Sequence, residues 1–176
     1  CKYWGKGATI FWQIAENDDV RSGQVLLYDS ITGKRVKKPF NHITWVHTIL
    51  KKNGHIKEFN LEQTLFGMHL ISREPENKII AIVEAPKTAC IMSTIFPDYL
   101  WMATCGLSNI NLKRLNPIKP RKIVLYPDLG AYKIWKTKAN IMKKAGYKIE
   151  VSTLLETKYQ RFPAGSDIAD LFIDKL

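Results

Sequence analysis

Two patterns of apolar residues divide the chain. Before residue 72, bulky β-forming residues cluster in two short runs, residues 9–14 and 23–28, with the polar turn Glu16-Asn17-Asp18-Asp19 between them. This pattern predicts a β-hairpin. Further along, residues 43–52 are expected to form a short helix, and Asn60 is expected to cap another helix that includes Leu61, Leu65 and Phe66.

From residue 72 onward, apolar runs of strand length alternate with helical patterns. Strands are predicted at residues 78–83, 99–103, 122–126 and 148–151. Helices are predicted at residues 87–95, 111–115 and 131–145, and a last one after Gly165-Ser166, with Ser166 as its N-cap. Alternating strands and helices predict an α/β fold with a mostly parallel sheet and helices on both faces. We therefore expect a small β-rich module at residues 1–71 and an α/β domain at residues 72–176.

The stretch from Lys78 to Ala89 contains the clearest candidate for chemistry. A run of apolar residues, four of the first six β-branched, ends at Glu84, and Pro86 follows where a helix can begin. Open α/β sheets place their ligands at the carboxyl ends of strands. Glu84 is therefore either a site residue or an ordinary solvated strand end, and the stretch alone leaves both readings open.

Three further carboxylates stand at the ends of α/β elements: Asp128 after the run Ile123-Val124-Leu125-Tyr126, and Asp167 and Asp170 at the start of the final helix. A parallel sheet would gather them with Glu84 at one edge. Clustered carboxylates suit a divalent cation, and Mg²⁺ is the natural one because it prefers oxygen ligands. The competing interpretation is helix capping, which alone would explain each aspartate.

The net charge of +11 favours a polyanionic partner, with nucleic acid first. Between Lys113 and Lys148 there are eleven Lys and Arg residues and a single acid, Asp128. In the predicted helix 131–145, Ile134, Trp135, Ile141, Met142 and Ala145 form an expected buried face, and the lysines lie opposite. A solvated face is the common explanation of such a stripe, but its lack of interspersed acids favours a nucleic-acid surface. The candidate phosphate-binding residues are Lys87, Arg121, Lys122, Lys133, Lys136, Lys143 and Lys144.

Other chemistry is less well supported. The three cysteines are far apart and show no zinc or disulfide spacing. His42 and His47 lie near Trp45 without an acidic or cysteine partner close in sequence, which favours packing over metal binding. Pro97 and Asp98 interrupt the longest apolar region, so no membrane span is expected, and a cytoplasmic location is predicted.

These residues together resemble the Toprim domain, the α/β catalytic unit of primases, topoisomerases and related nucleases. The resemblance covers residues 77–176 and rests on Ile82-Val83-Glu84-Ala85, Tyr126-Pro127-Asp128-Leu129-Gly130 and Ser166-Asp167-Ile168-Ala169-Asp170. It implies that Glu84 and Asp128 are catalytic. It also implies that Glu84, Asp128, Asp167 and Asp170 form a Mg²⁺ site.

More narrowly, the whole chain resembles Toprim-like proteins of bacterial mobile elements, of the DUF6371 type. The motifs are Phe11-Trp12-Gln13-Ile14, Asn41-His42-Ile43-Thr44-Trp45-Val46-His47, Leu65-Phe66-Gly67 and Pro127-Asp128-Leu129-Gly130. The chain departs from the family patterns at Ala85-Pro86 and at Gly130, where the Toprim pattern has a second aspartate. These departures predict weaker metal binding.

Three functions follow from this sequence. The first is a nucleic-acid-binding, primase-like protein of a DNA replication or mobile-element system, with Mg²⁺-dependent phosphoryl transfer. The second is a catalytically degenerate fold that binds nucleic acid or a replication partner such as a helicase, and the third is a nucleotide-binding module. DNA is the expected polymer.

Overall fold

The computed structural model describes residues 2–4, 7–159 and 161–173, and it begins with an antiparallel sheet. The sheet has the strand order β1-β2-β3-β4. Its strands are β1 (Lys2–Trp4), β2 (Ala8–Ile14), β3 (Val20–Leu27) and β4 (Ile43–Trp45). The predicted hairpin is confirmed, because β2 and β3 pair antiparallel from Ala8↔Leu27 to Ile14↔Val20.

Two predicted helices of this region differ from the structure. Residues 43–52 divide into edge strand β4 and helix α1 (Val46–Lys52), because Ile43 to Trp45 pair with β3. The helix predicted from Asn60 is wrong. Phe66 instead exchanges backbone hydrogen bonds with Ala103 (2.9 and 3.1 Å), which requires an extended backbone. A 3₁₀ helix, η1 (Met68–Arg73), begins only after Gly67, whose φ is 89°.

The second sheet is parallel, as predicted, with the strand order β6-β5-β7-β8. Its strands are β5 (Ile80–Val83), β6 (Leu100–Ala103), β7 (Ile123–Leu125) and β8 (Ile149–Val151). The helices are α2 (Pro86–Ile95), α3 (Leu112–Leu115), α4 (Tyr132–Lys144), α5 (Leu154–Lys158) and α6 (Asp170–Ile173), with two 3₁₀ turns, η2 (Leu107–Asn109) and η3 (Asn116–Ile118). The mixed α/β fold class is confirmed.

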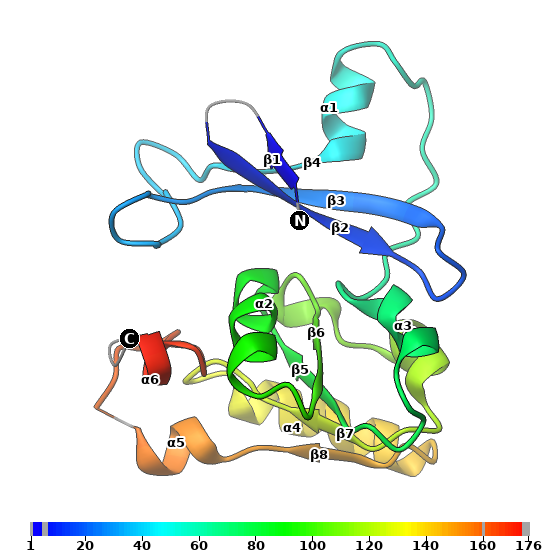
Figure 1. Cartoon of the computed structure of the whole chain (residues 1–176), viewed down its shortest axis with the longest axis vertical. Helices are drawn as coiled ribbons and strands as arrows, with labels where there is room; N and C mark the ends of the chain where they lie inside the picture. Colours follow the sequence, from blue (N-terminus) through cyan, green and yellow to red (C-terminus); the bar gives the residue numbers. More distant parts are fainter. Residues whose placement is uncertain (1, 5–6, 160, 174–176) are drawn as a thin grey trace.

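The parallel sheet separates two apolar cores. In β5, Ile80 and Ile82 join the core that contains Trp135 of α4, whereas Ala81 and Val83 join the core that contains Met92 of α2. Figure 1 shows α2 and α4 on opposite sides of the sheet. Successive strand residues point to opposite faces, so a strand covered on both sides must be apolar throughout, as β5 is.

The predicted buried face of α4 is partly wrong. Trp135, Ala139 and Met142 are buried, but Ile134 and Ile141 are exposed. The apolar face is therefore narrower than the sequence suggests, because it contacts the sheet along one line of residues three or four apart.

The end of the chain also differs in detail. Helix α5 was not predicted, and the last helix, α6, begins at Asp170 rather than directly after Ser166. Its turn is capped by Asp167 rather than Ser166: Asp167 Oδ1 accepts from the backbone N–H groups of Ala169 (2.8 Å) and Asp170 (3.3 Å). Asp170 Oδ2 accepts in return from the N–H of Asp167 (2.9 Å).

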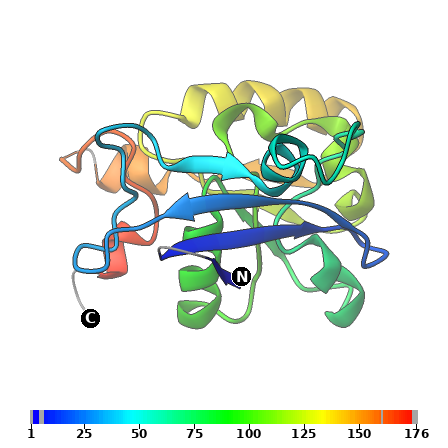
Figure 2. The same cartoon turned by 90° about the horizontal axis from the view of Figure 1, so that it is seen from above.

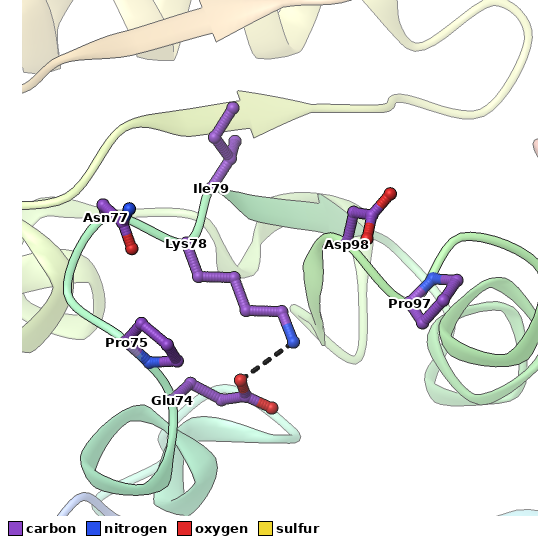
Figure 3. Close-up of a pocket in the computed structure, with 7 residues that line it drawn as sticks. All are labelled: Glu74, Pro75, Asn77, Lys78, Ile79, Pro97 and Asp98. Atoms are coloured by element: carbon purple, nitrogen blue, oxygen red, sulfur yellow. Dashed lines mark hydrogen bonds and ion pairs between the residues drawn. The ribbon is translucent and has the colours of Figure 1, made fainter.

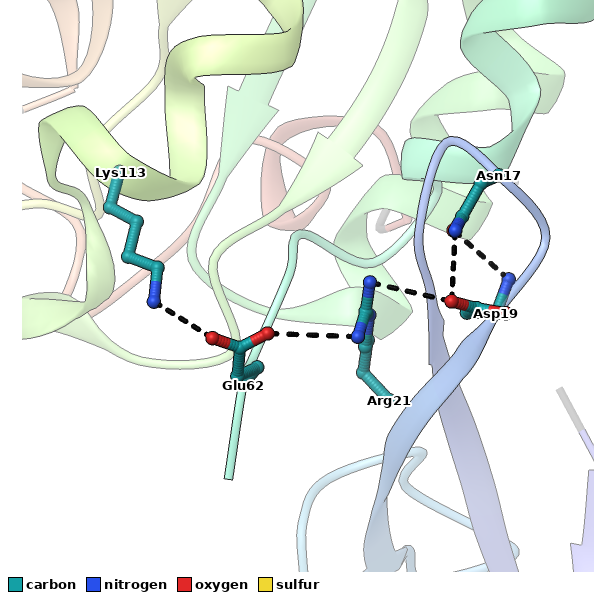
Figure 4. Close-up of polar contacts among 5 residues, drawn as sticks. All are labelled: Asn17, Asp19, Arg21, Glu62 and Lys113. Carbon is teal, nitrogen blue, oxygen red and sulfur yellow. Dashed lines mark hydrogen bonds and ion pairs between the residues drawn. The ribbon is translucent and has the colours of Figure 1, made fainter. Parts of the chain in front are cut away.

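The antiparallel sheet lies across the α/β unit on the side of α2 (Figures 1 and 2). Phe11 of β2 meets Phe66 edge to face, with ring centroids 5.7 Å apart. At one end Glu62 bridges Arg21 of β3 (3.7 Å) and Lys113 of α3 (3.0 Å), as Figure 4 shows. The division at residue 71/72 stays a prediction, although the two sheets lie on either side of it.

Candidate functional site

Glu84 and Asp128 follow neighbouring strands at the point where the strand order of the parallel sheet reverses. From β5 the chain passes to β6 on one side, and it later returns to β7 on the other side of β5. Glu84 directly follows β5, and Asp128 lies three residues beyond the end of β7. Such a switch point is where open α/β sheets bind their ligands. The sheet therefore brings these two carboxylates to one edge, as the sequence led us to expect.

Asp128 has the most unusual environment of the four carboxylates. Burial, together with the nearby charges of Glu84, Asp167 and Asp170, raises the pKa of Asp128 to about 8. Its Oδ1 atom is buried and has no hydrogen-bond partner. Asp128 does not cap α4 with its side chain; only its backbone carbonyl accepts, from the N–H of Ala131 (2.9 Å). Capping therefore does not explain why an aspartate stands here.

Asp167 and Asp170 come to this edge from the last turn of the chain. Thr88 Oγ1 of α2 donates to Asp167 Oδ2, which joins the chain end to the beginning of α2. Burial raises the pKa of Asp167, and the Thr88 hydrogen bond opposes that effect. For these two aspartates the capping interpretation does hold, since they cap the α6 turn reciprocally. Asp167 also lies near the carboxylate edge, since its negative charge contributes to the raised pKa of Asp128.

Glu84 is half-buried, and burial raises its pKa. The charge of Arg35 opposes this shift, so the loop between β3 and β4 reaches the neighbourhood of Glu84. Tyr28 lies at the base of the same loop and pairs with Arg35 as an isolated bridge. Burial raises the pKa of Tyr28 to about 12, against the charge of Arg35. Sequence reasoning missed both residues; the only signal was the basic run from Lys34 to Lys38.

Lys87 lies in the first turn of α2, where it was predicted to receive a phosphate. In the structure its Nζ donates to the carbonyl oxygen of Gly33 (3.2 Å) and lies 5.6 Å from the centroid of the Tyr28 ring. Its charge also opposes the rise that burial causes in the pKa of Asp167. Lys87 therefore joins the β3–β4 loop to the carboxylate edge, and it is half-buried there.

The structure offers oxygen ligands at this edge, but not a complete metal cage. Across residues 2–4, 7–159 and 161–173, no group of three or more His, Cys, Asp or Glu side chains could by itself hold a metal ion. Mg²⁺ does not require such a group, because it usually binds through one or two carboxylates, waters and substrate phosphates. The unpartnered buried oxygen of Asp128, with three acidic neighbours, fits that mode of binding.

Arg121 is a correction to the predicted phosphate surface. Its side chain is buried, with the residue 9% exposed, and it donates to the carbonyl oxygens of Pro75 (2.8 Å), Ile71 (2.7 Å) and Glu74 (3.0 Å). These bonds hold the end of η1 against the α/β unit, so Arg121 has a structural role. The adjacent Lys122 is exposed and 3.7 Å from Glu150, a weak surface pair.

The lysines of α4 extend away from the carboxylate edge. Lys133, Lys143 and Lys144 are exposed and Lys136 is half-buried. At about 1.5 Å per residue, Lys144 lies roughly 17 Å along the helix from Lys133. Only the lysines of the first turns are therefore near Asp128, and the others could contact only a longer ligand.

Gly130 stands where the Toprim pattern has a second aspartate. Its φ of 93° suits glycine, and its N–H donates to Glu156 Oε1 of α5 (2.8 Å). Glu156 was not predicted, since α5 itself was not. The Glu156 carboxylate thus lies next to Gly130, but it belongs to α5 and already accepts a hydrogen bond from the Gly130 N–H.

A surface pocket lies away from these carboxylates. Figure 3 shows it at the amino ends of β5 and β6, with the Lys78–Glu74 ion pair (2.8 Å) on one wall. Its remaining lining residues are Pro75, Asn77, Ile79, Pro97 and Asp98. The carboxylates are at the opposite ends of these strands, so this pocket is not part of the site.

Within the described residues no helix is long and apolar enough to span a membrane.

Comparison with solved structures defines the class of fold. The chain resembles the primase fragment of the bacteriophage T7 primase-helicase protein, with a TM-score of 0.52 and 16% identity over 82% of this chain and 52% of that one. It also resembles the RNA polymerase domain of the Mycobacterium tuberculosis primase DnaG, with a TM-score of 0.57 and 17% identity over 94% of this chain and 50% of that one. The chain therefore has a primase-like fold, and it spans about half the length of these structures.

The sequence family of the chain is a more specific assignment than its fold. The chain belongs to the family described as "Domain of unknown function (DUF6371)", whose model matches residues 1–129. The predicted DUF6371 membership is thus confirmed, whereas the Toprim resemblance stays a prediction. The matched region includes Glu84 and Asp128 and ends before Asp167. None of the curated proteins compared with the chain matches it.

Proposed function

We propose that this chain is a primase-like, nucleic-acid-binding protein of a DNA replication or mobile-element system, and that its carboxylate edge performs Mg²⁺-dependent phosphoryl transfer. One observation carries the proposal: Glu84 and Asp128 meet at the switch point of a primase-like sheet, and Asp128 keeps a buried, unpartnered oxygen there. Burying a polar atom without a hydrogen-bond partner costs free energy. A bound ligand that supplies the missing partner removes this cost.

Asp128 would hold the metal together with Asp167 or Asp170. Bound Mg²⁺ would supply charge stabilisation for the transferring phosphate. The pKa of about 8 means that metal-free Asp128 is mostly protonated at neutral pH, so its proton would leave when a cation binds. Thr88 would keep Asp167 oriented toward this edge through its hydroxyl group.

Glu84 would act as the general acid or base. Burial raises the pKa of Glu84, and a carboxyl with a raised pKa holds and releases a proton more readily than a fully ionised one. Arg35 lies close enough to oppose that shift, and it would stabilise the ionised form or an entering phosphate. Lys87, at the beginning of α2, would receive a second phosphate.

A second candidate is a protein of this fold that binds nucleic acid, or a replication partner such as a helicase, without catalysis. The environment of Gly130 favours it, because the second metal-binding aspartate of the Toprim pattern is absent there and Glu156 is engaged with the Gly130 N–H. In that case the α4 lysines and the β3–β4 loop would still bind a phosphate backbone. Nucleotides are the third ligand class that this edge suits.

Calorimetric titration with Mg²⁺ tests the proposal. The wild type should bind Mg²⁺, and Asp128→Asn should weaken binding by at least about tenfold, the cost of a lost metal ligand. Glu84→Gln tests the neighbouring carboxylate in the same way. Glu150→Gln is the matched control, because Glu150 is an exposed carboxylate on β8 that forms a weak ion pair with Lys122. Absence of Mg²⁺ binding by the wild type would leave only the second candidate.

A further inference from the structure

An exposed aromatic ring stands among cations in residues 34–42, between β3 and β4; we name this segment the stacking loop. Phe40 is 64% exposed. Its ring stacks on His42 with the centroids 4.4 Å apart and the planes 25° from parallel. Leaving a phenylalanine in water forgoes about 1.5–3 kcal/mol of burial, so its exposure needs an explanation.

The stacking loop is anchored at its base. The Val36 N–H donates to the Leu27 carbonyl (2.9 Å), and the Leu27 N–H donates to the His42 carbonyl (3.2 Å). The His42 N–H donates to the Val36 carbonyl (3.3 Å), which closes the segment. The ring pair is thus presented on a fixed backbone, which lowers the entropy lost when a flat ligand binds it.

The charge around the ring pair is positive. Lys34, Arg35, Lys37 and Lys38 are exposed, and the sequence of the loop contains no acid. Over the described residues, none of these four forms a salt bridge. Asp29, the nearest acid before the loop, accepts from the N–H groups of Ile31 (3.1 Å) and Thr32 (2.7 Å), and so it is already engaged.

A second aromatic stack lies beyond the other end of β4. His47 and Phe59 are parallel within 2°, with centroids 4.7 Å apart. Phe59 is also exposed. Ser22 Oγ is 2.7 Å from His47 Nδ1 and holds the imidazole in place. Since β4 is an edge strand, the two stacks flank an open edge of the sheet.

We propose that the stacking loop binds single-stranded DNA, with a base stacked on Phe40 and the flanking phosphates on Lys37 and Lys38. Aromatic faces beside a basic track are the general means of holding single strands, because every base has a face to stack. A duplex keeps its bases stacked internally and cannot use the ring. DNA rather than RNA follows from the proposed role in DNA replication. Arg35 then connects this track to the neighbourhood of Glu84.

This inference rests on the nucleic-acid part of the proposed function and adds the binding surface and the form of the polymer. Fluorescence anisotropy with a labelled oligodeoxythymidine tests it. Phe40→Ala should weaken binding about tenfold, within the range measured for one base–aromatic stack. Phe40→Tyr, which keeps a ring, should retain affinity within about twofold. Ile31→Ala is the matched control: Ile31 is 92% exposed just before the loop but has no ring, and its loss should change nothing.

The salt dependence separates stacking from charge. Phe40→Ala should shift the affinity without changing the salt slope, because stacking releases no counterions. Lys37→Ala and Lys38→Ala should each reduce the slope by about 0.7, the value for one phosphate contact on a single strand. Equal binding of single strand and duplex, tighter binding of the matching ribo-oligonucleotide, or equal effects of Phe40→Ala and Ile31→Ala would each overturn the proposal.

The two proposals can fail separately. If the wild type binds Mg²⁺ but no oligonucleotide, the stacking loop is overturned and the carboxylate site remains. If it binds the oligonucleotide through Phe40 but no Mg²⁺, the stacking loop is supported and phosphoryl transfer is lost. Circular dichroism of each variant shows whether it is folded, and Phe40→Tyr provides a second, conservative change should Phe40→Ala fail to fold.

Discussion

Lys87 Nζ donates a 3.2 Å hydrogen bond to the carbonyl oxygen of Gly33, and this bond joins the two halves of the candidate site. Lys87 belongs to α2, which begins just after Glu84, while Gly33 belongs to the loop after β3. The same ammonium group lies over the Tyr28 ring. One side chain thus fixes the basic β3–β4 loop beside the carboxylates of the parallel sheet.

Removing this connection should loosen the loop. We expect Lys87→Ala to increase amide hydrogen exchange at Asp29 and Gly33, whose N–H groups bond within the turn, while lowering global stability by only about 1 kcal/mol. Exchange mass spectrometry measures the first effect and urea unfolding the second. Lys34→Ala, which removes an exposed cation of the same loop, is the control. Equal exchange in both variants would show that Lys87 does not hold the loop.

Asp128 should make metal-free stability depend on pH. Its folded-state pKa of about 8 is above the unfolded value of about 3.8, so between these values the folded state binds a proton that the unfolded state lacks. Stability should therefore fall as the pH rises from about 4 to 8. Asp128→Asn, which cannot ionise, should flatten this fall and be more stable than the wild type at pH 8 by on the order of a few kcal/mol.

Thermal unfolding across this pH range, with chelator present, measures the effect. Added Mg²⁺ should restore part of the wild-type stability at pH 8 and leave Asp128→Asn nearly unchanged, because a ligand that binds only the folded state stabilises it. A wild-type stability that rises steadily from pH 4 to 8 would contradict the environment assigned to Asp128.

Adjacent basic residues should differ sharply in their importance for stability. Arg121→Ala removes hydrogen bonds to three backbone carbonyls, of which that of Pro75 keeps a further donor, the Lys78 N–H, so it should cost about 2–3 kcal/mol of unfolding free energy. Lys122→Ala loses only an exposed ion pair and should cost less than about 1 kcal/mol. Chemical denaturation of the two variants tests this, and equal costs would refute a structural role for Arg121.

The α4 lysines should contribute charge to nucleic-acid binding without base preference. If Lys143 and Lys144 each contact a phosphate, replacing both by Ala should reduce the salt slope for single-stranded DNA by about 1.4. Lys51 and Lys52, at the end of α1, provide a matched double variant that should leave the slope unchanged. A slope identical to the wild type in the Lys143 and Lys144 variant would restrict binding to the carboxylate edge and the stacking loop.

The pattern of apolar residues was enough to predict the alternation of strands and helices in the α/β domain and the position of its carboxylates at strand ends. The strand β5 is recognisable because it is buried on both faces and so must be apolar at every position. Glu84 then stands out as the first charge after that run. A parallel sheet requires such strand ends to share an edge, which is why Glu84 and Asp128 could be placed together without coordinates.

The neighbouring charges and hydrogen-bond partners of those residues depend on the tertiary packing. Arg35 reaches the neighbourhood of Glu84 from a loop about fifty residues earlier in the sequence, and Glu156 reaches Gly130 from an unpredicted helix. The sequence suggests that Arg121 is a surface cation, but in the structure its guanidinium group donates to three backbone carbonyls. The segment after Asn60 has helical periodicity, but pairing of Phe66 with Ala103 overrides it. The local pattern of a sequence shows which residues are buried. Which residues distant in the sequence come into contact depends on how the two sheets pack.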